Sequence, residues 1–232
     1  MDEALSGLLV IDKPAGVTSF DCVYRVKRIL RAAKVGHCGT LDPMAKGVLL
    51  LLVGKATREQ ENFLGLEKQY RFRAQFGQAT NTGDCEGTLT ETKDFNHVTR
   101  TRLEGVLQSF HGLQMQTPPR YAALKYKGRA YYRWARMGVE IPRAPRPIEI
   151  YSIELLSLEG AFWEARVICS RGTYIRTLAE DIAVRLETVG MLNDLVRERV
   201  GAYALSDALS WERVIGSCRE ELSAHFQCAA PS

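Results

Sequence analysis

The chain has 232 residues and a net charge of +4, with 46% hydrophobic and 25% charged residues. This composition is typical of a globular protein that buries a substantial core, as one large domain or as a domain with an insertion. It excludes a membrane-spanning class, because the longest apolar run, Val48–Val53, is far shorter than the roughly 20 residues that cross a bilayer. The acidic start and the short run Leu8–Ile11 do not form a signal peptide, so we expect a cytoplasmic protein.

The cysteines and histidines favour neither a disulfide scaffold nor a metal site. The six cysteines are widely spaced without a CxxC pair, and the four histidines are isolated from one another. Such a pattern is typical of reduced thiols in the cytosol. We therefore expect no bound metal.

The N-terminal part is predicted to begin with a strand and a helix. Gly7–Asp12 is a predicted strand, and a turn starts at Lys13. Ser19 is a suitable N-cap for a helix over about residues 20–32. The apolar spacing of this helix places three cations on the side away from the core: Lys27, Arg28 and Arg31.

A glycine-rich stretch, Gly36–Leu49, contains the first candidate for catalysis. Proline restricts the residue before it to extended backbone, so the pair Asp42-Pro43 keeps this carboxylate on a loop rather than in a helix. The loop leads into a buried strand from about Gly47 to Val53. A rigid acid in such a place suits catalysis, but Asp-Pro is also a common start of a turn. The local pattern leaves both interpretations open.

The middle of the chain contains strands and one clear helix. The alternation of Gln69–Phe76, with Tyr70 on the apolar face, predicts a strand with one buried side. A polar loop then leads to a short strand at Gly87–Glu91. Thr101 and Glu104 have the spacing of a capping box at the start of the helix that follows.

A basic, aromatic segment lies between Arg120 and Glu149. It contains eight Lys or Arg and two Glu, a net charge of +6, so the rest of the chain carries −2. Cations with interleaved rings suit nucleic acid, because they offer charge for phosphates and flat faces for unstacked bases. The alternative is a solvated basic helix whose aromatic side chains face the core. These side chains are Tyr121, Tyr126, Tyr131, Tyr132 and Trp134.

The last part of the chain completes a mixed α/β pattern in one core domain. Ile148–Leu158 and Phe162–Cys169 form a predicted hairpin across a Glu-Gly turn. Thr173 is the expected cap of a helix from Tyr174 to about Leu186. A short helix is predicted near Met191–Val196.

Four side chains from separate stretches could supply chemistry together: Asp42, Tyr70, Tyr174 and Arg176. An ionised aspartate in a half-buried cleft needs a cation beside it, and arginine can supply a bidentate one. Arg176 lies in the first turn of its predicted helix, which suits that role. The alternative is an arginine exposed on the surface.

Four motifs resemble the TruB family of RNA pseudouridine synthases, which act on the T-loop of tRNA. The motifs follow the order and spacing of the family over about residues 7–203, and a motif Asp12-Lys13-Pro14 also fits. They are Gly36-His37-Cys38-Gly39-Thr40-Leu41-Asp42-Pro43, Lys68-Gln69-Tyr70, Pro118-Pro119-Arg120-Tyr121 with Lys125-Tyr126-Lys127-Gly128, and Cys169-Ser170-Arg171-Gly172-Thr173-Tyr174-Ile175-Arg176.

This resemblance implies the pseudouridine synthase fold, an α/β (α+β) arrangement with a mixed, mostly antiparallel sheet flanked by helices. It also implies isomerisation of uridine to pseudouridine at position 55 of tRNA. The reaction breaks the N1–C1′ bond and rejoins the uracil through C5, so one carboxylate suffices and no cofactor is needed. Asp42 matches that carboxylate, which either attacks C1′ or removes the 2′ proton.

The resemblance also assigns residues that bind the substrate. Tyr70 matches the tyrosine that stacks on the target base, and Tyr174 lines the same pocket. Arg176 matches the arginine that pairs with the catalytic aspartate. His37 matches a residue that contacts the tRNA loop and helps hold the flipped base, whose extrusion costs a few kcal/mol. Lys13 is the last substrate-binding residue implied.

The domain organisation implied is a catalytic domain over residues 1–212, with a thumb-like insertion at about 113–147. Residues 213–232 are then a tail, too short for the PUA-type RNA-binding domain of many relatives. We therefore expect weaker reliance on the acceptor stem of tRNA than in longer relatives. A monomer is expected, with tRNA as its partner.

Three alternatives differ in class. A guide-RNA-dependent synthase of the archaeal and eukaryotic branch is the nearest. A non-catalytic RNA-binding or tRNA-folding protein would keep the basic segment but would not need Asp42. A glycoside hydrolase would ordinarily need a second carboxylate, for which only Asp84 and Glu86 are available.

Overall fold

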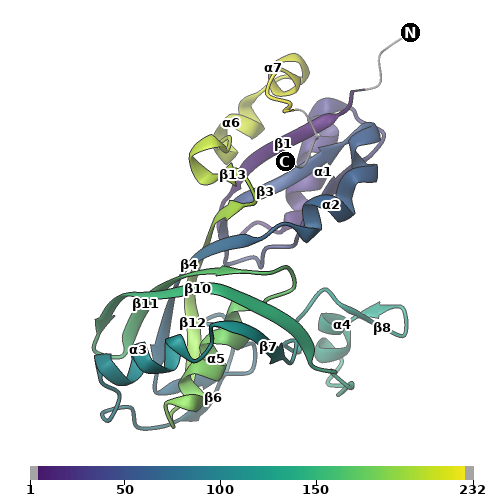
Figure 1. The fold of residues 1–232 in the computed structure, drawn as a ribbon. Coiled ribbons are helices and arrows are strands. Elements are labelled where there is room, and N and C mark those ends of the chain that lie inside the picture. The colour runs from purple at the N-terminus through teal and green to yellow at the C-terminus, as the bar shows by residue number, and fades with distance from the viewer. Residues whose placement is uncertain (1–4, 228–232) are drawn as a thin grey trace. The chain divides into compact units, whose positions relative to one another are not determined.

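The computed structural model describes residues 5–227 and divides the chain into two compact units (Figure 1). Unit 1 comprises residues 1–70 and 196–232, and unit 2 comprises residues 71–195. The chain crosses between them within strands β4 (Lys68–Phe76) and β12 (Gly190–Val200). Both units combine a sheet with helices, which confirms the predicted α+β class. Residues 228–232, with Cys228 and the end of the predicted tail, lie outside the described residues.

In unit 1, strand β3 (Lys46–Val53) lies at the centre of the sheet. It pairs antiparallel with β1 (Gly7–Lys13) and β2 (Val35–His37), and parallel with the end of β12. A short strand, β13 (Tyr203–Ala204), pairs with β12 and precedes the 3-10 turn η2 (Leu205–Asp207). The two strands predicted in this part of the chain are confirmed.

Both faces of the β1–β3 pair are covered by helices. On one face lie α1 (Ser19–Leu30), α6 (Trp211–Gly216) and α7 (Arg219–Ser223). On the other face lie η1 (Gly54–Glu59) and α2 (Gln60–Gly65). This double coverage explains why β3 is an unbroken apolar run rather than an alternating one. The sequence pattern did not predict α6 and α7.

The start of α1 differs from the prediction by one residue. Thr18 is the N-cap, and it forms a reciprocal capping box with Asp21. Ser19 is instead buried inside the first turn, where its hydroxyl bonds to the backbone of Leu41. The prediction of Ser19 as the cap is therefore wrong, because two neighbouring hydroxyl residues compete for one position and the tertiary contact decides between them.

Unit 2 is built on a sheet that continues from β4. The strand order is β12-β4-β11-β10-β7, with β11 (Phe162–Cys169), β10 (Arg146–Glu159) and β7 (Gly112–Gln116) (Figure 1). Strand β10 pairs antiparallel with both β11 and β7. The β10–β11 pair confirms the predicted hairpin. A separate two-stranded sheet joins β5 (Gln78–Thr80) to β6 (Leu89–Thr92).

Two helices of unit 2 contact each other: α3 (Arg100–Gln108) and α5 (Ile175–Arg185). Thr99 caps α3 by accepting a hydrogen bond from Arg102, so the capping box predicted at Thr101 is wrong. None of the helices in residues 5–227 is long and apolar enough to cross a membrane.

The helix predicted near Met191–Val196 is wrong, since these residues belong to strand β12. A short apolar run does not distinguish a strand from a buried helix. Backbone partners decide it here: Leu192 donates to the carbonyl of Gly83 at 3.0 Å and accepts from the amide of Cys85 at 2.9 Å. These partners lie more than a hundred residues earlier in the chain, and no local pattern reveals them.

The basic segment of unit 2 folds as a small hairpin followed by a helix. Strands β8 (Lys125–Tyr126) and β9 (Arg129–Ala130) flank a two-residue turn, and α4 (Tyr131–Arg136) follows. Both turn residues, Lys127 and Gly128, have positive φ, at 47° and 78°. This is the geometry that two-residue hairpin turns require.

Candidate functional site

Asp42 lies half-buried on the loop between β2 and β3, in unit 1. Its two neighbours are tied to the N-terminal segment of the same unit. The Ser19 hydroxyl accepts from the amide of Leu41 at 2.9 Å and donates to its carbonyl at 3.1 Å. The amide of Gly16 donates to the carbonyl of Pro43 at 2.8 Å. The backbone on both sides of the carboxylate is therefore held in place.

Lys13 is fully buried beside this loop. Its ammonium donates to the carbonyls of Val17 at 2.7 Å, Pro14 at 2.8 Å and Pro43 at 3.3 Å. Burial lowers the pKa of Lys13 to about 8. Because its ammonium donates three hydrogen bonds inside the protein, Lys13 holds the loop. The contact with substrate expected from the sequence stays a prediction.

Arg197 of β12 is a second buried cation of unit 1 that holds the Asp42 loop, and it is absent from the predicted site residues. It donates to the carbonyls of Val48 at 2.7 Å and Gly39 at 3.1 Å. Gly47, with φ at +103°, passes so close that an added Cβ would lie 2.3 Å from the Arg197 carbonyl oxygen. Only glycine allows β3 and β12 to approach this closely.

His37 ends β2 and belongs to the same loop region. The side chain of Gln60 donates to its backbone carbonyl at 2.8 Å. Its ring Nδ1 is buried and has no hydrogen-bond partner within residues 5–227. Burial lowers the pKa of His37, and the nearby charge of Arg197 lowers it further, so the imidazole is neutral at pH 7.

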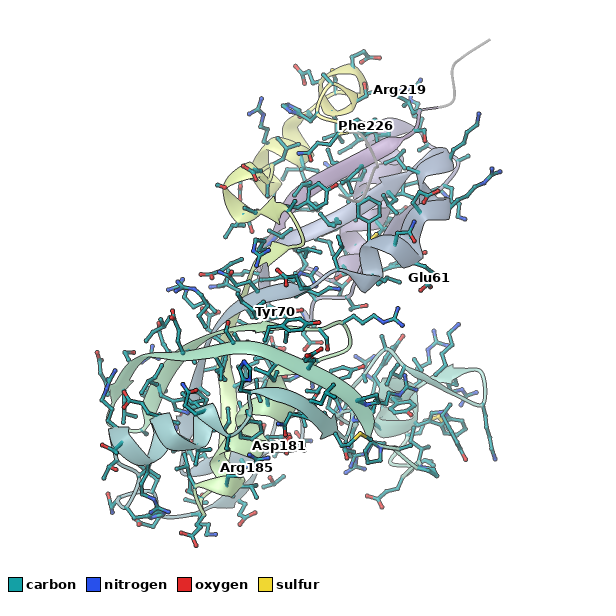
Figure 2. All side chains as sticks on the ribbon, viewed as in Figure 1. Glu61, Tyr70, Asp181, Arg185, Arg219 and Phe226 are labelled. Atoms are coloured by element: carbon teal, nitrogen blue, oxygen red, sulfur yellow. The ribbon has the colours of Figure 1, made fainter. Side chains whose placement is uncertain are left out.

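Tyr70 is the last residue of unit 1 in β4 and is only 8% exposed (Figure 2). The two residues before it fix the strand. Gln69 donates to the Glu198 carboxylate at 2.8 Å, and the buried Lys68 donates to the carbonyl of Leu64 at 2.6 Å. The Lys-Gln-Tyr motif thus contains two residues that hold the backbone and one ring on the buried side of the strand.

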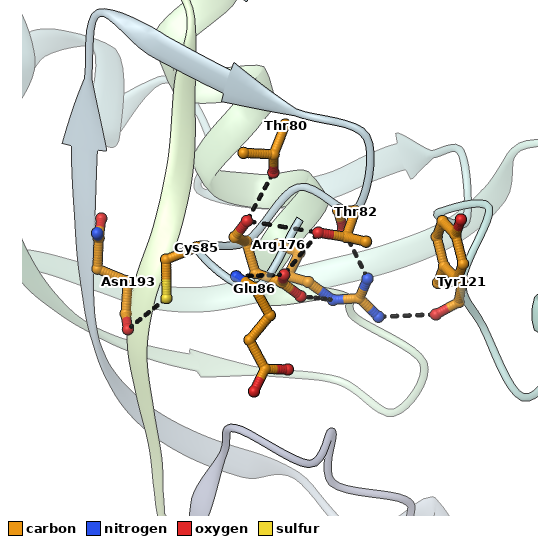
Figure 3. A network of polar contacts seen from close by, with 8 residues as sticks. Thr80, Thr82, Cys85, Glu86, Tyr121, Arg176 and Asn193 are labelled. Carbon is orange, nitrogen blue, oxygen red and sulfur yellow. Dashed lines mark hydrogen bonds and ion pairs between the residues drawn. The ribbon is translucent and has the colours of Figure 1, made fainter. Parts of the chain in front are cut away.

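In unit 2, Arg176 is the centre of a buried polar network (Figure 3). Its guanidinium donates to the carbonyls of Thr82 and Tyr121, both at 2.8 Å, and its Nε lies 3.7 Å from the Asp84 carboxylate. Asp84 in turn accepts from the Thr82 hydroxyl at 2.6 Å and the Glu86 amide at 3.2 Å. One arginine therefore holds the 80–87 loop and the start of the basic segment.

Arg176 is only 4% exposed, so the alternative of a surface arginine is wrong. Its ion pair with Asp84 lies wholly within unit 2, whereas Asp42 belongs to unit 1. The pairing of Arg176 with the catalytic aspartate therefore stays a prediction. Asp84, considered as a second carboxylate for glycoside hydrolysis, is occupied by this structural pair.

Tyr174 is the N-cap of α5, and its backbone is held by a buried amide side chain. Gln116, at the end of β7, accepts from the Tyr174 amide at 2.8 Å and donates to its carbonyl at 3.1 Å. Thr173, the predicted cap, instead donates to the carbonyl of Ser170 at 3.0 Å. The start of α5 is thus joined to the chain just before the basic segment.

The basic segment combines features of both interpretations raised by its sequence. Most of its cations are exposed, while Tyr131 is buried. Three further rings carry a cation over one face: Tyr126 under Lys127 at 5.5 Å, Trp134 under Arg129 at 5.0 Å and Tyr132 under Arg136 at 5.6 Å. The segment therefore presents positive charge held in place by aromatic side chains.

Glu180 is a buried carboxyl group that the sequence did not single out. It lies one turn after Arg176 on α5 and packs against Gly83, where an added Cβ would lie 2.7 Å from its Oε1. Burial raises the pKa of Glu180 to about 7, helped by the charge of Asp181 (Figure 2) and opposed by Arg176 and Arg143. The protein thus stabilises the protonated form of this side chain.

We expect Glu180 to make the fold less stable as the pH rises. The folded pKa, about 7, lies above the ordinary value of 4.5 for a glutamate, so the folded state binds more protons between these values and stability falls as the pH increases through them. When the pH is raised from 5 to 8, the unfolding free energy of Glu180→Gln should rise by about 2–3 kcal/mol relative to that of wild type. Urea unfolding at both pH values measures this. A constant difference between the two proteins would contradict it.

The comparisons with known proteins agree with one another. The family model for TruB family pseudouridylate synthase (N terminal domain) matches residues 27–175. The chain is 40% identical to tRNA pseudouridine synthase B of Endomicrobium trichonymphae over 208 residues, covering 90% of each chain. It is 45% identical to the protein of the same name from Bordetella avium over 210 residues, covering 90% of this chain and 86% of the relative.

Solved structures give the same fold. A chain from the Cbf5-Nop10-Gar1 complex matches with a TM-score of 0.75 and 27% identity, covering 97% of this chain. This chain spans 61% of the length of that one. A chain from the archaeal box H/ACA Nop10-Cbf5 complex matches with a TM-score of 0.71 at 24% identity. The predicted pseudouridine synthase fold is confirmed. The chain belongs to the TruB family of pseudouridylate synthases.

Proposed function

We propose that this chain converts uridine to pseudouridine in tRNA, at position 55 of the T-loop, with Asp42 as the catalytic carboxylate. The relatives at 40–45% identity are named tRNA pseudouridine synthase B, which supports the substrate class. The observation that carries the role of Asp42 is the loop itself. Two buried cations, Lys13 and Arg197, and the Ser19 hydroxyl hold the backbone around this half-buried carboxylate.

The central requirement of the isomerisation is a carboxylate held in a fixed position. The N1–C1′ bond breaks, the uracil turns, and a C5–C1′ bond forms; C5 loses a proton and N1 gains one. Asp42 either attacks C1′ or removes the 2′ proton to start this sequence. Either step depends on holding the carboxylate at the reacting atom, which a rigid loop achieves.

The residues around the target base are proposed from their chemistry. Tyr70 offers a ring for stacking on the extruded uracil, and Tyr174 offers a second ring to the substrate. His37 is neutral, so it contacts the tRNA loop by hydrogen bonding rather than by charge. Extruding a base from a folded loop costs a few kcal/mol, which these contacts offset. The exposed cations of the basic segment bind phosphates.

Two alternatives remain to be separated by experiment. A non-catalytic tRNA-folding protein would use the basic segment alone. A guide-RNA-dependent synthase is suggested by the match to a structure titled as an H/ACA RNP bound to a substrate RNA, at 27% identity. The greater identity to the tRNA pseudouridine synthase B proteins supports the stand-alone tRNA enzyme.

The test is to incubate the full chain alone with an unmodified tRNA transcript and map pseudouridine by chemical probing. We expect conversion at U55, without a guide RNA and in the presence of EDTA. A transcript with cytidine at position 55 is the control for background signal. Binding without product would favour the tRNA-folding protein, and product only after a guide RNA is added would favour the guide-dependent enzyme.

A further inference from the structure

Helix α1 of unit 1 exposes a line of large side chains that neither the core nor the proposed site uses. Phe20 is 71% exposed and Tyr24 is 55% exposed. Lys27 and Arg31 are exposed further along the chain. Since an α-helix turns about 100° per residue, positions 20, 24 and 27 lie on one face of α1, and Arg31 is the cap at its C-terminal end. We call these four residues the α1 stripe.

The opposite side of α1 forms the core contact. Cys22, Val26 and Leu30 are fully buried there. Aromatic side chains on an exposed face are therefore not explained by packing, because burial would place them with these three residues. The Arg28 guanidinium lies 5.7 Å from the centroid of the Tyr24 ring, which adds a cation beside the stripe.

The charges around the stripe are mostly positive. Arg25 and Arg28 are exposed on the same helix. Asp21 is the acidic residue of α1, and its Oδ2 accepts hydrogen bonds from the amide and the hydroxyl of Thr18 at the N-terminus of the helix. Hydrogen bonds at the start of α7 lower the pKa of Glu220, and the charges of Arg219 and Arg31 lower it further. Lys27 and Arg28 are therefore the cations best placed to bind an anion.

The stripe begins beside the proposed catalytic loop, within the same unit. Ser19, which precedes Phe20, makes two hydrogen bonds to Leu41, the residue before Asp42. From Phe20 the stripe runs along the helix for about 10 Å to Lys27, at 1.5 Å per residue. The N-terminal end of the stripe is therefore joined to the loop that carries Asp42.

We propose that the α1 stripe is an RNA-binding surface for the nucleotides next to the target uridine. Phe20 and Tyr24 stack on bases or ribose faces, while Lys27, with Arg28 and Arg31, binds phosphates. Rings followed by cations match the alternating chemistry of a single strand, whereas a docking face for a protein would have an apolar centre depleted of charge. This proposal rests on the proposed function, because it takes the RNA to be the substrate.

The test compares Lys27→Ala with Arg25→Ala in the full chain. Both residues are exposed cations of α1, but Arg25 points roughly 130° away from the stripe. Binding of an unmodified tRNA transcript is measured by fluorescence anisotropy at several salt concentrations. We expect Lys27→Ala to weaken binding about 3- to 10-fold and to reduce the log–log salt slope by about 0.7–0.9, and Arg25→Ala to change neither.

The two aromatic residues of the α1 stripe are tested with Phe20→Ala and Tyr24→Ala. Each variant is expected to bind the tRNA transcript about 5-fold more weakly, or weaker still. Equal affinity for all variants, with unchanged thermal unfolding, would overturn the proposal and leave the stripe to a protein partner. A separate assay of pseudouridine formation by the wild-type protein tests the proposed function. If wild type forms no product, the proposed function fails; if it forms product but the stripe variants bind like Arg25→Ala, the stripe alone fails.

Discussion

Asp42→Asn is expected to abolish pseudouridine formation while leaving tRNA binding within about 3-fold of wild type. The amide has nearly the shape of the carboxylate, so the loop held by Lys13, Ser19 and Arg197 should keep its structure. It cannot attack C1′ or accept the 2′ proton, because the neutral amide is neither a nucleophile nor a base. Losing such a group lowers the rate of the chemical step by at least about 1,000-fold.

Single-turnover kinetics with excess enzyme on an unmodified tRNA transcript measures this step directly. Glu61→Gln is the matched control, since it makes the same carboxylate-to-amide change at an exposed position of unit 1. It should retain the wild-type rate. Full turnover by Asp42→Asn would remove the catalytic assignment even though the family membership stands. If Asp42→Asn loses both tRNA binding and turnover, the substitution disturbs the structure of the loop.

The predicted elements that proved right are those whose signal is local. β1 and β3 are short apolar runs bounded by glycines, and β10–β11 alternate around a Glu-Gly turn. The burial pattern of these strands depends on consecutive residues only, so the sequence alone predicts it. The strand β12 was not predicted because its partners β3, β4 and the 83–85 loop lie more than a hundred residues earlier in the chain. The cap of α1 was not predicted because a tertiary contact with Leu41 decides between Thr18 and Ser19.

The same distinction applies to the site. The Asp-Pro pair was enough to place Asp42 on a loop, because proline acts on the residue directly before it. The sequence could not show that Arg197 holds this loop, since its partners are backbone carbonyls about 150 residues earlier and any residue has a carbonyl. Arg176 was expected to pair with Asp42, which stays a prediction; the ion pair within unit 2 is with Asp84, and no local pattern indicates it.

The Arg176 network leads to a second large prediction, this time for stability. In Arg176→Met, the Asp84 carboxylate would stay buried without its cation, and the carbonyls of Thr82 and Tyr121 would each lose a donor. Removing one partner of a buried ion pair costs about 3–5 kcal/mol. Arg171→Met changes an exposed arginine of the preceding turn and should cost no more than about 0.5 kcal/mol.

A double-mutant cycle shows whether the cost comes from the buried charge. Asparagine at position 84 can still accept from Thr82 and Glu86, but it leaves no unpaired charge behind. Asp84→Asn combined with Arg176→Met should therefore be more stable than Arg176→Met alone, by about 1 kcal/mol or more. Urea unfolding of the four proteins measures the cycle. If the double variant loses as much unfolding free energy as the two single variants together, the prediction that the two side chains interact is contradicted.

Limited trypsin digestion tests whether the Arg176 network also anchors the basic segment. Because Arg176 binds the Tyr121 carbonyl, its loss should release the chain just before Lys125 and Lys127, which are exposed cleavage sites. We expect cleavage there to be faster in Arg176→Met than in Arg171→Met at a urea concentration where both remain folded. Equal cleavage would mean that Gln116, through Tyr174, is sufficient to anchor the segment. Faster cleavage would identify one arginine that stabilises unit 2 and orders its basic segment.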